Sequence, residues 1–232
     1  MALRTATVRA LSEIPGLVHG FEQRGPGDGA ETREESHARV ARALDGNGRL
    51  LLLKQVHGVA VVEAPWDGMP EADVSVAARP GWLLGIQTAD CLPVLLVDPT
   101  RRLVAAAHAG WRGTAAGVAP RAVAALAARG SRPEDLVAAL GPGIGACCYE
   151  MGDEVREAFS PSGAAFFRPG PAGRPRLDVR AANVRQLLDA GLLPGALNHV
   201  AECTRCRPDL YHSWRRDGRA AGRMISFVGF RD

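Results

Sequence analysis

The 232-residue chain has no long apolar segment and no leader-like start. None of its apolar runs approaches the roughly 18 residues that a membrane helix requires, and residues 1–7 lack the basic and apolar regions of a signal peptide. We therefore expect a cytoplasmic protein with no membrane partner. The charge balance, 28 basic against 25 acidic residues, is too even to indicate a nucleic-acid-binding protein.

Cysteine is also scarce. The chain has five cysteines, an odd number that cannot pair completely, and a chain of this length forms a core without disulfide staples. Reduced thiols in catalytic or metal-binding roles are therefore favoured. The Cys203-Thr-Arg-Cys206 motif has no second CxxC in the sequence, so we interpret its thiols as structural. The roles of Cys147 and Cys148 stay open.

No internal repeat or low-complexity block divides the chain, which predicts one domain over residues 1–232. Helices are predicted at residues 36–44 after a capping box at Thr32, at 115–129 before Gly130, and at 178–190. Apolar runs predict strands at 50–53, 59–63, 82–87, 94–97, 103–107, 136–140, 199–202 and 224–228. Because strands outnumber helices and hairpins mix with crossovers, we predict an α/β (α+β) fold, a layered sandwich of mixed β-sheets flanked by helices.

One predicted hairpin brings two metal-binding residue types together. If Pro99 and Thr100 form its loop, Cys91 lies directly opposite His108, with Cβ atoms roughly 4.5 to 5.5 Å apart. We expect His57 to end a separate apolar strand, which makes it a third candidate ligand. One thiolate and two imidazoles suit a catalytic zinc site, which keeps three protein ligands and one open position. Any one of these residues alone would ordinarily belong to the core.

The residues leave other chemistries open. Cysteine and histidine also bind copper, although the six histidines include no His-x-His pair of the kind that multicopper oxidases use. Cys91 and His108 could instead form the nucleophile and base of a cysteine hydrolase, or the three residues could belong to a metal carrier. Asp90 precedes Cys91 and should face away from it in a strand, so we expect Asp90 to brace the loop.

Arginines mark possible anion contacts. Arg112 lies between glycines just before a predicted helix, where free amides attract anions. Arg215 and Arg216 belong to an arginine-rich stretch before the last predicted strand, and guanidinium groups suit phosphates. The glycine-rich loop at 141–145 matches neither a Walker motif nor a dinucleotide fingerprint.

Several motifs together resemble the YfiH-like family, also known as the laccase-domain or polyphenol oxidase family and regarded as a purine nucleoside phosphorylase group. The motifs span nearly the whole chain in order: His19-Gly-Phe21 with Arg24, Gln55-Val-His-Gly58, Ala89-Asp-Cys-Leu-Pro93, His108-Ala-Gly-Trp-Arg-Gly-Thr114, Gly141-Pro-Gly-Ile144, Cys148-Tyr-Glu150, Ser213-Trp-Arg-Arg216 and Gly222-Arg223. The resemblance implies a layered YfiH/CNF-like α/β fold and a zinc ion, or alternatively copper, on His57, Cys91 and His108.

The resemblance also implies an activity. Its substrates would be adenosine, inosine, guanosine and S-methyl-5'-thioadenosine with phosphate, with adenosine deamination as a second reaction; some relatives are linked to editing of peptidoglycan precursors. The predicted catalytic residues are His57, Cys91 and His108, and the protein is expected to be a monomer. Predicted substrate contacts are Arg24, Gln55, Arg112, Arg215 and Arg216. The segment after Arg24 departs from the family pattern, because it is shorter and lacks a serine.

Overall fold

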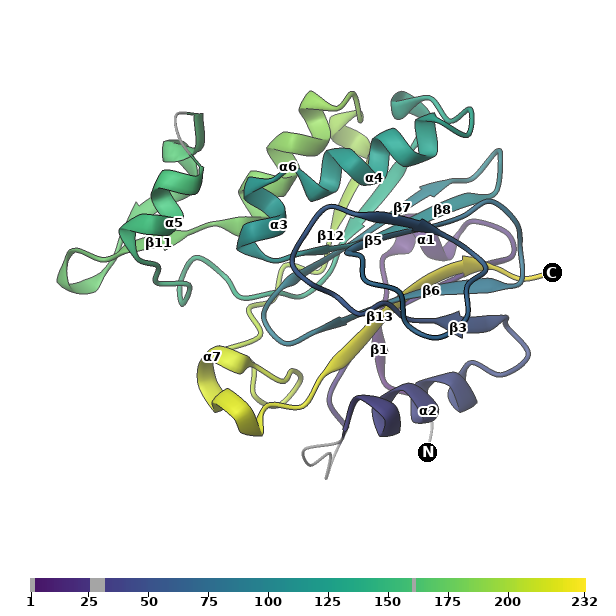
Figure 1. The fold of residues 1–232 in the computed structure, drawn as a ribbon, viewed down its shortest axis with the longest axis horizontal. Coiled ribbons are helices and arrows are strands. Elements are labelled where there is room, and N and C mark those ends of the chain that lie inside the picture. Colours follow the sequence, from purple (N-terminus) through teal and green to yellow (C-terminus); the bar gives the residue numbers. More distant parts are fainter. Residues whose placement is uncertain (1–2, 26–31, 160–161) are drawn as a thin grey trace.

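Two β-sheets lie face to face between layers of helices in the computed structural model (Figure 1). The structure describes residues 3–25, 32–159 and 162–232, so the predicted loop after Arg24 lies mostly outside the described residues. Several helices cover the outer face of one sheet, and one helix covers the outer face of the other. This architecture confirms the predicted layered α/β fold.

The six-stranded sheet carries the hairpin of the predicted metal site. Its strands run in the order β12-β9-β7-β8-β5-β4, with parallel pairs at both edges and antiparallel pairs between them. The strands are β12 (Leu197–His199), β9 (Val137–Leu140), β7 (Leu92–Asp98), β8 (Leu103–Ala109), β5 (Val74–Ala77) and β4 (Val61–Glu63).

The five-stranded sheet packs against the inner face of the first. Its order is β1-β2-β13-β6-β3, and only β3 and β6 are parallel. The strands are β1 (Thr5–Ala6), β2 (Leu17–Glu22), β13 (Met224–Phe230), β6 (Trp82–Thr88) and β3 (Arg49–Leu51). The sequence patterns did not predict β2 or β5.

The helices complete the layers. The outer face of the six-stranded sheet is covered by α3 (Trp111–Ala115), α4 (Val118–Ala127) and α6 (Val179–Asp189), and α2 (Arg33–Ala43) covers the five-stranded sheet (Figure 1). Smaller elements are α1 (Arg9–Ser12), α5 (Asp153–Ala158), α7 (Trp214–Asp217), and the hairpin of β10 (Phe167–Pro169) with β11 (Pro175–Leu177). In Figure 1, α5 and β11 project from the body of the molecule.

Strand β7 shows why the central strands are apolar throughout. Val94 and Leu96 pack toward the helices, whereas Leu95 and Val97 pack against the other sheet. Successive side chains of a strand point to opposite faces, and both faces of this strand are covered. A continuous apolar run is therefore the pattern that this position requires.

The predicted register of the β7–β8 hairpin was wrong by two residues. Pro93, not Cys91, lies opposite His108, and Asp98 pairs with Leu103. The loop is longer than predicted because the Asp98 carboxylate accepts the backbone N–H groups of Thr100 and Arg101 and Arg102 adopts a left-handed φ of 55°. A shift of two residues keeps every side chain on its face, so Cys91 still lies on the same side as His108.

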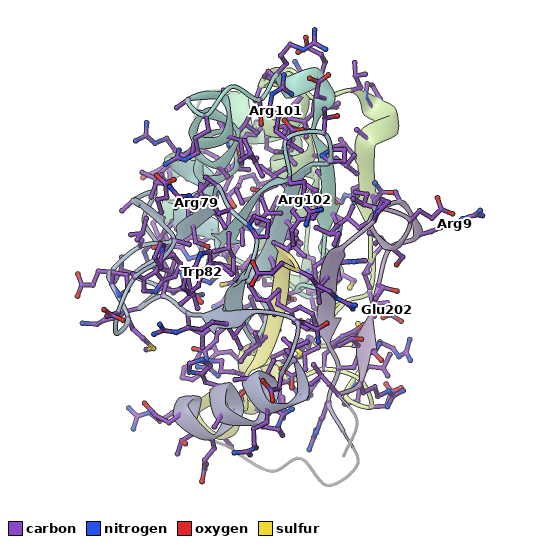
Figure 2. The ribbon with its side chains drawn as sticks, turned by 90° about the vertical axis from the view of Figure 1, so that its right-hand side faces the viewer. Arg9, Arg79, Trp82, Arg101, Arg102 and Glu202 are labelled. Carbon is purple, nitrogen blue, oxygen red and sulfur yellow. The ribbon has the colours of Figure 1, made fainter. Side chains whose placement is uncertain are left out.

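The far end of this hairpin is tied to both layers. Arg101 forms ion pairs with Asp98 and Asp135, whereas the Arg102 guanidinium lies over the ring of Phe230 and donates to the carbonyl of Arg231. Figure 2 shows Arg101 nearer the helices and Arg102 nearer the C-terminal strand. The hairpin is thus anchored at the end opposite to Cys91.

Two of the three predicted helices begin at the expected capping residues. Thr32 and Glu35 form the expected capping box of α2, and Asp178 caps α6 through the amide of Ala181. The helix predicted at 115–129 is present as α4, but its predicted start was wrong, because Gly117 adopts a φ of 82° and separates α4 from α3. Within the described residues, no helix is both long and apolar enough to cross a membrane.

Candidate active site

His57, Cys91 and His108 come together as predicted. One ligand atom from each lies within 4.8 Å of the other two, and the two imidazole rings are 4.8 Å apart between centroids. Cys91 immediately precedes β7, His108 lies near the end of β8, and His57 lies in the loop after β3. The prediction that His57 ends a strand was wrong, because β3 ends at Leu51.

A fourth residue, Asp73, holds both histidines in place. The Asp73 carboxylate lies 2.7 Å from His108 Nδ1 and accepts the backbone N–H groups of Val56, His57 and Gly58 at 3.1, 3.0 and 2.7 Å. Three consecutive amides around one carboxylate stabilise the left-handed backbone of His57, whose φ is 62°. The bond at Nδ1 leaves His108 Nε2 as the ring nitrogen available for a ligand.

Sequence reasoning missed Asp73. It lies directly before β5, a strand that the patterns did not predict, and its side chain is fully buried. Its one sequence signal is an acidic residue at the start of the apolar run Val74-Ser-Val-Ala77. Buried carboxylates are seldom left without a charged or hydrogen-bonding partner, so that signal could have directed attention to this position.

Asp90 braces the segment that carries Cys91, as expected. Its side chain accepts hydrogen bonds from the Thr204 hydroxyl at 2.6 Å and from the Arg215 amide at 2.6 Å. Its backbone has a φ of 91°, a strained value for a residue with a side chain. These contacts tie the Cys91 segment to the C-terminal part of the chain.

Cys91 and His108 shift each other's pKa in opposite directions. Burial alone would raise the pKa of Cys91, but the charge and hydrogen bond of His108, with a contribution from His57, lower it to about 6. Burial opposes protonation of His108, but the Cys91 charge and the Asp73 carboxylate raise the pKa of the imidazole to about 9. Cys91 is therefore a thiolate at neutral pH, the form that binds metals and attacks electrophiles.

His57, Cys91 and His108 line a cavity of about 600 Å³. Its volume falls in the range of small-molecule sites. Two arginines that the sequence predicted, Arg112 and Arg215, line it, and so does Arg223. Its other lining residues include three aromatic side chains and several polar ones: Trp111, Tyr149, Trp214, Gln55, Gln87, Thr88, Asp90, Glu150 and Glu154.

The chain matches the family described as multi-copper polyphenol oxidoreductase laccase over residues 20–231. It belongs to this family. A purine nucleoside phosphorylase of Deinococcus radiodurans is 39% identical over 224 residues, which cover 96% of this chain and 87% of that protein. An adenosine deaminase, RL5, from an unknown prokaryotic organism is 36% identical over 170 residues, 72% of this chain and 64% of that one.

A solved structure confirms the YfiH-like resemblance. The crystal structure of the hypothetical protein YfiH from Bacillus licheniformis has a TM-score of 0.85, a sequence identity of 29% and coverage of 94% of each chain. The laccase-domain family and the gathered donors together indicate a metal-binding protein.

Two of the predicted substrate contacts in this laccase-family chain lie away from the cavity. Arg216 directs its guanidinium to the carbonyls of Thr204, Arg205 and Tyr211 and to Asp217. Arg24 lies beside the carbonyl of Pro208. Neither is among the lining residues, so their role in binding substrate stays a prediction without structural support.

Gln55 lines the cavity, but its amide is already engaged. It exchanges two hydrogen bonds of 2.8 Å with the backbone of Gln87. The Gln87 side chain also lines the cavity, and within the described part of the chain its buried amide nitrogen has no hydrogen-bond partner. Gln87, which the sequence did not single out, is therefore a donor available to a ligand.

Proposed function

We propose that this protein is a zinc-dependent purine nucleoside phosphorylase that acts on adenosine, inosine, guanosine and S-methyl-5'-thioadenosine, with adenosine deaminase activity. The observation that carries the proposal is the His57–Cys91–His108 centre in the wall of a cavity that is also lined by aromatic rings and arginines. The chain's similarity to a purine nucleoside phosphorylase and to an adenosine deaminase supports the same conclusion.

The donor set fits zinc. One thiolate and two neutral imidazoles are typical ligands of zinc with a fourth position left open, and Asp73 provides the carboxylate that usually supports a metal-binding histidine. Bound zinc supplies Lewis acidity and lowers the pKa of water, which favours attack by an oxygen nucleophile. Copper binds similar donors. A multicopper centre needs more histidines, and the described residues contain no other histidine in a comparable group.

The chain's own residues prepare the centre for that chemistry. His108 must lose its proton to bind zinc, and the ordered Asp73 bond at Nδ1 directs Nε2 toward the other donors. Cys91 already favours its thiolate form, as its lowered pKa shows. Asp73 binds the loop of His57 through three amides, so little reorganisation is needed when the ion binds.

The rest of the cavity suits a nucleoside and phosphate. The rings of Trp111, Tyr149 and Trp214 offer apolar surfaces for a flat purine. The Arg112 guanidinium stacks 4.2 Å from the Trp111 ring, which places a cation beside one of those surfaces. Arg112 and Arg215 together offer the positive charge that phosphate requires. The unpartnered amide of Gln87 offers a hydrogen bond to a purine acceptor.

One observation also favours a cysteine hydrolase. Cys91, His108 and Asp73 follow the order thiol, imidazole and carboxylate that such enzymes use, and a peptidoglycan precursor could be the substrate. His57 decides between the two designs, because a hydrolase triad has no need of a second imidazole beside the thiol. We therefore favour the metal centre.

Product analysis tests the proposal. The purified protein is incubated with adenosine and inosine, each with and without phosphate, and the products are separated by chromatography. We expect free base and ribose 1-phosphate only when phosphate is present, and inosine from adenosine in either case. Chelator-treated protein serves as the matched control and should lose both reactions. Full activity after metal removal, or no turnover of any purine nucleoside by the zinc-loaded protein, would contradict the proposal.

A further inference from the structure

Four cysteines form a second cluster outside the candidate active site. Cys147 and Cys148 lie in the loop after β9, and Cys203 and Cys206 lie in the segment after β12. Their sulfur atoms all lie within 4.8 Å of one another. The sequence showed a CxxC motif with no second pair. The fold supplies that pair as two adjacent cysteines from a distant part of the chain.

The sulfur positions differ from those of disulfides. Cys206 Sγ lies 3.7 Å from Cys147 Sγ and 3.4 Å from Cys148 Sγ, whereas a disulfide bond is about 2.0 Å long. All four cysteines are free thiols. In a tetrahedral zinc site with Zn–S bonds of about 2.3 Å, neighbouring sulfur atoms lie about 3.8 Å apart. The separations around Cys206 are close to that value.

Backbone contacts hold the two segments in this arrangement. Gly143 and Cys203 form an isolated parallel bridge, and the amide of Gly145 donates to Cys203 Sγ at 3.2 Å. Amide hydrogen bonds to sulfur orient thiolate ligands and stabilise their charge. A Cβ atom at Gly145 would lie 3.1 Å from Cys147 Sγ and 3.2 Å from Cys203 Cβ. Glycine at this position therefore lets the two segments approach closely.

We propose that Cys147, Cys148, Cys203 and Cys206 bind a second zinc ion in a closed, structural site with four thiolate ligands. Four sulfur donors with no open position are characteristic of structural zinc. They differ from the mixed donors of the His57–Cys91–His108 centre, where one position stays open. Soft thiolates also select zinc over magnesium or calcium.

The cluster joins two segments that lie next to the candidate active site. Cys148 directly precedes Tyr149 and Glu150, which line the cavity. On the other side, Cys203 precedes Thr204, whose hydroxyl donates to Asp90 beside Cys91. An ion shared by both segments fastens one wall of the cavity to the residues that brace the catalytic thiol. This zinc thus stabilises the cavity without touching the substrate.

Zinc loading of a variant without the catalytic thiol tests the inference. Cys91→Ser protein is reduced, stripped of metal and reloaded with zinc alone, and bound zinc and its sulfur coordination are measured by mass spectrometry and X-ray absorption. We expect one equivalent of zinc with a shell of sulfur alone. Zinc should bind more than about 100-fold more weakly when Cys206→Ser or Cys147→Ser is added to this protein.

Two controls make the result decisive. Cobalt loading of Cys91→Ser needs no substitution in the cluster, and it should give the intense charge-transfer absorption of a four-thiolate site even if a cluster variant fails to fold. Zinc binding by the wild-type chain tests the His57–Cys91–His108 centre separately. If that centre fails to bind zinc, the four cysteines should still give the sulfur-only signal, so the two proposals can fail independently. The inference is overturned if Cys91→Ser binds no metal through sulfur alone, or if the four cysteines are recovered as disulfides that reduction converts to thiols without zinc affinity.

Discussion

The Asp73 carboxylate determines the geometry of the centre at the scale of single residues. It contacts the ring of one histidine and the backbone of the other. Burial raises its pKa, but hydrogen bonds from His108 and from the amides of Gly58 and Val56 lower it below its usual value. The residue therefore stays charged and accepts all these hydrogen bonds at neutral pH.

Asp73→Asn is expected to weaken zinc binding at the catalytic centre by about 10- to 100-fold. An amide of nearly the same size fills the site, but it cannot accept four hydrogen bonds as a carboxylate does. Competition with a chromophoric chelator measures the affinity, in protein that carries Cys206→Ser so that only this centre is titrated. Asp67→Asn, at an almost fully exposed side chain, is the matched control. Equal zinc affinity in the two folded variants would show that Asp73 does not position the ligands.

Gly110 determines how closely the ligands can approach. A Cβ atom there would lie 2.8 Å from His57 Nδ1 and 3.0 Å from Cys91 Sγ. Its φ of −72° is open to any residue, so Gly110→Ala should preserve the fold while it displaces the ligands. We expect clearly weaker zinc binding and lower nucleoside turnover with an unchanged circular dichroism spectrum. Gly195→Ala, with open space around the added carbon, should match the wild type; similar behaviour of the two variants would contradict this account.

At the scale of elements, the β7–β8 hairpin shows what sequence can predict. The apolar runs located both strands and the correct face of Cys91, because side-chain alternation fixes the face. The register depended on the length of the turn, which is set by hydrogen bonds to Asp98. The apolar pattern of the sequence does not reveal such hydrogen bonds. The sequence predicted α2 and α6 from their capping residues. This succeeded because Thr32 and Asp178 each accept a hydrogen bond from an amide within the first turn, an interaction that depends only on nearby residues.

The turn at Asp98 also predicts a pH dependence of stability. Burial would raise the pKa of Asp98, but hydrogen bonds from Ser131 and Arg101 lower it below the ordinary value of 3.8. A carboxylate with a lowered folded-state pKa contributes stability above the unfolded pKa and loses it as the pH falls through the folded pKa. Asp98→Asn should therefore reduce the free energy of unfolding by about 1–3 kcal/mol at pH 7, and by progressively less below pH 3.8.

Urea unfolding of both proteins over a range of pH measures this difference. Glu134→Gln, a nearby change at a half-exposed side chain, is the control. Its free energy of unfolding should stay close to that of the wild type at every pH. A constant gap between the wild type and Asp98→Asn from neutral to acidic pH would mean that the charge of Asp98 is not what stabilises the turn.

At the scale of the whole molecule, the site depends on segments far apart in the sequence. His57, Asp73, Cys91 and His108 come from separate strands or loops around the six-stranded sheet, and the cavity is completed by Tyr149 and Arg215. The sequence indicated His57, Cys91 and His108 because their residue types are those that commonly bind metals. It could not predict Asp73 or Gln87, whose roles depend on burial and on partners that only tertiary packing provides.

Zinc titration of nucleoside phosphorolysis tests the central claim most directly. Metal-free wild-type protein is titrated with zinc while the release of hypoxanthine from inosine and phosphate is followed. The account predicts a negligible rate without zinc and a rate that rises with added zinc and then levels off, and it predicts no response in the Cys91→Ser protein. A full rate before zinc is added, or an unchanged response in the Cys91→Ser protein, would contradict it.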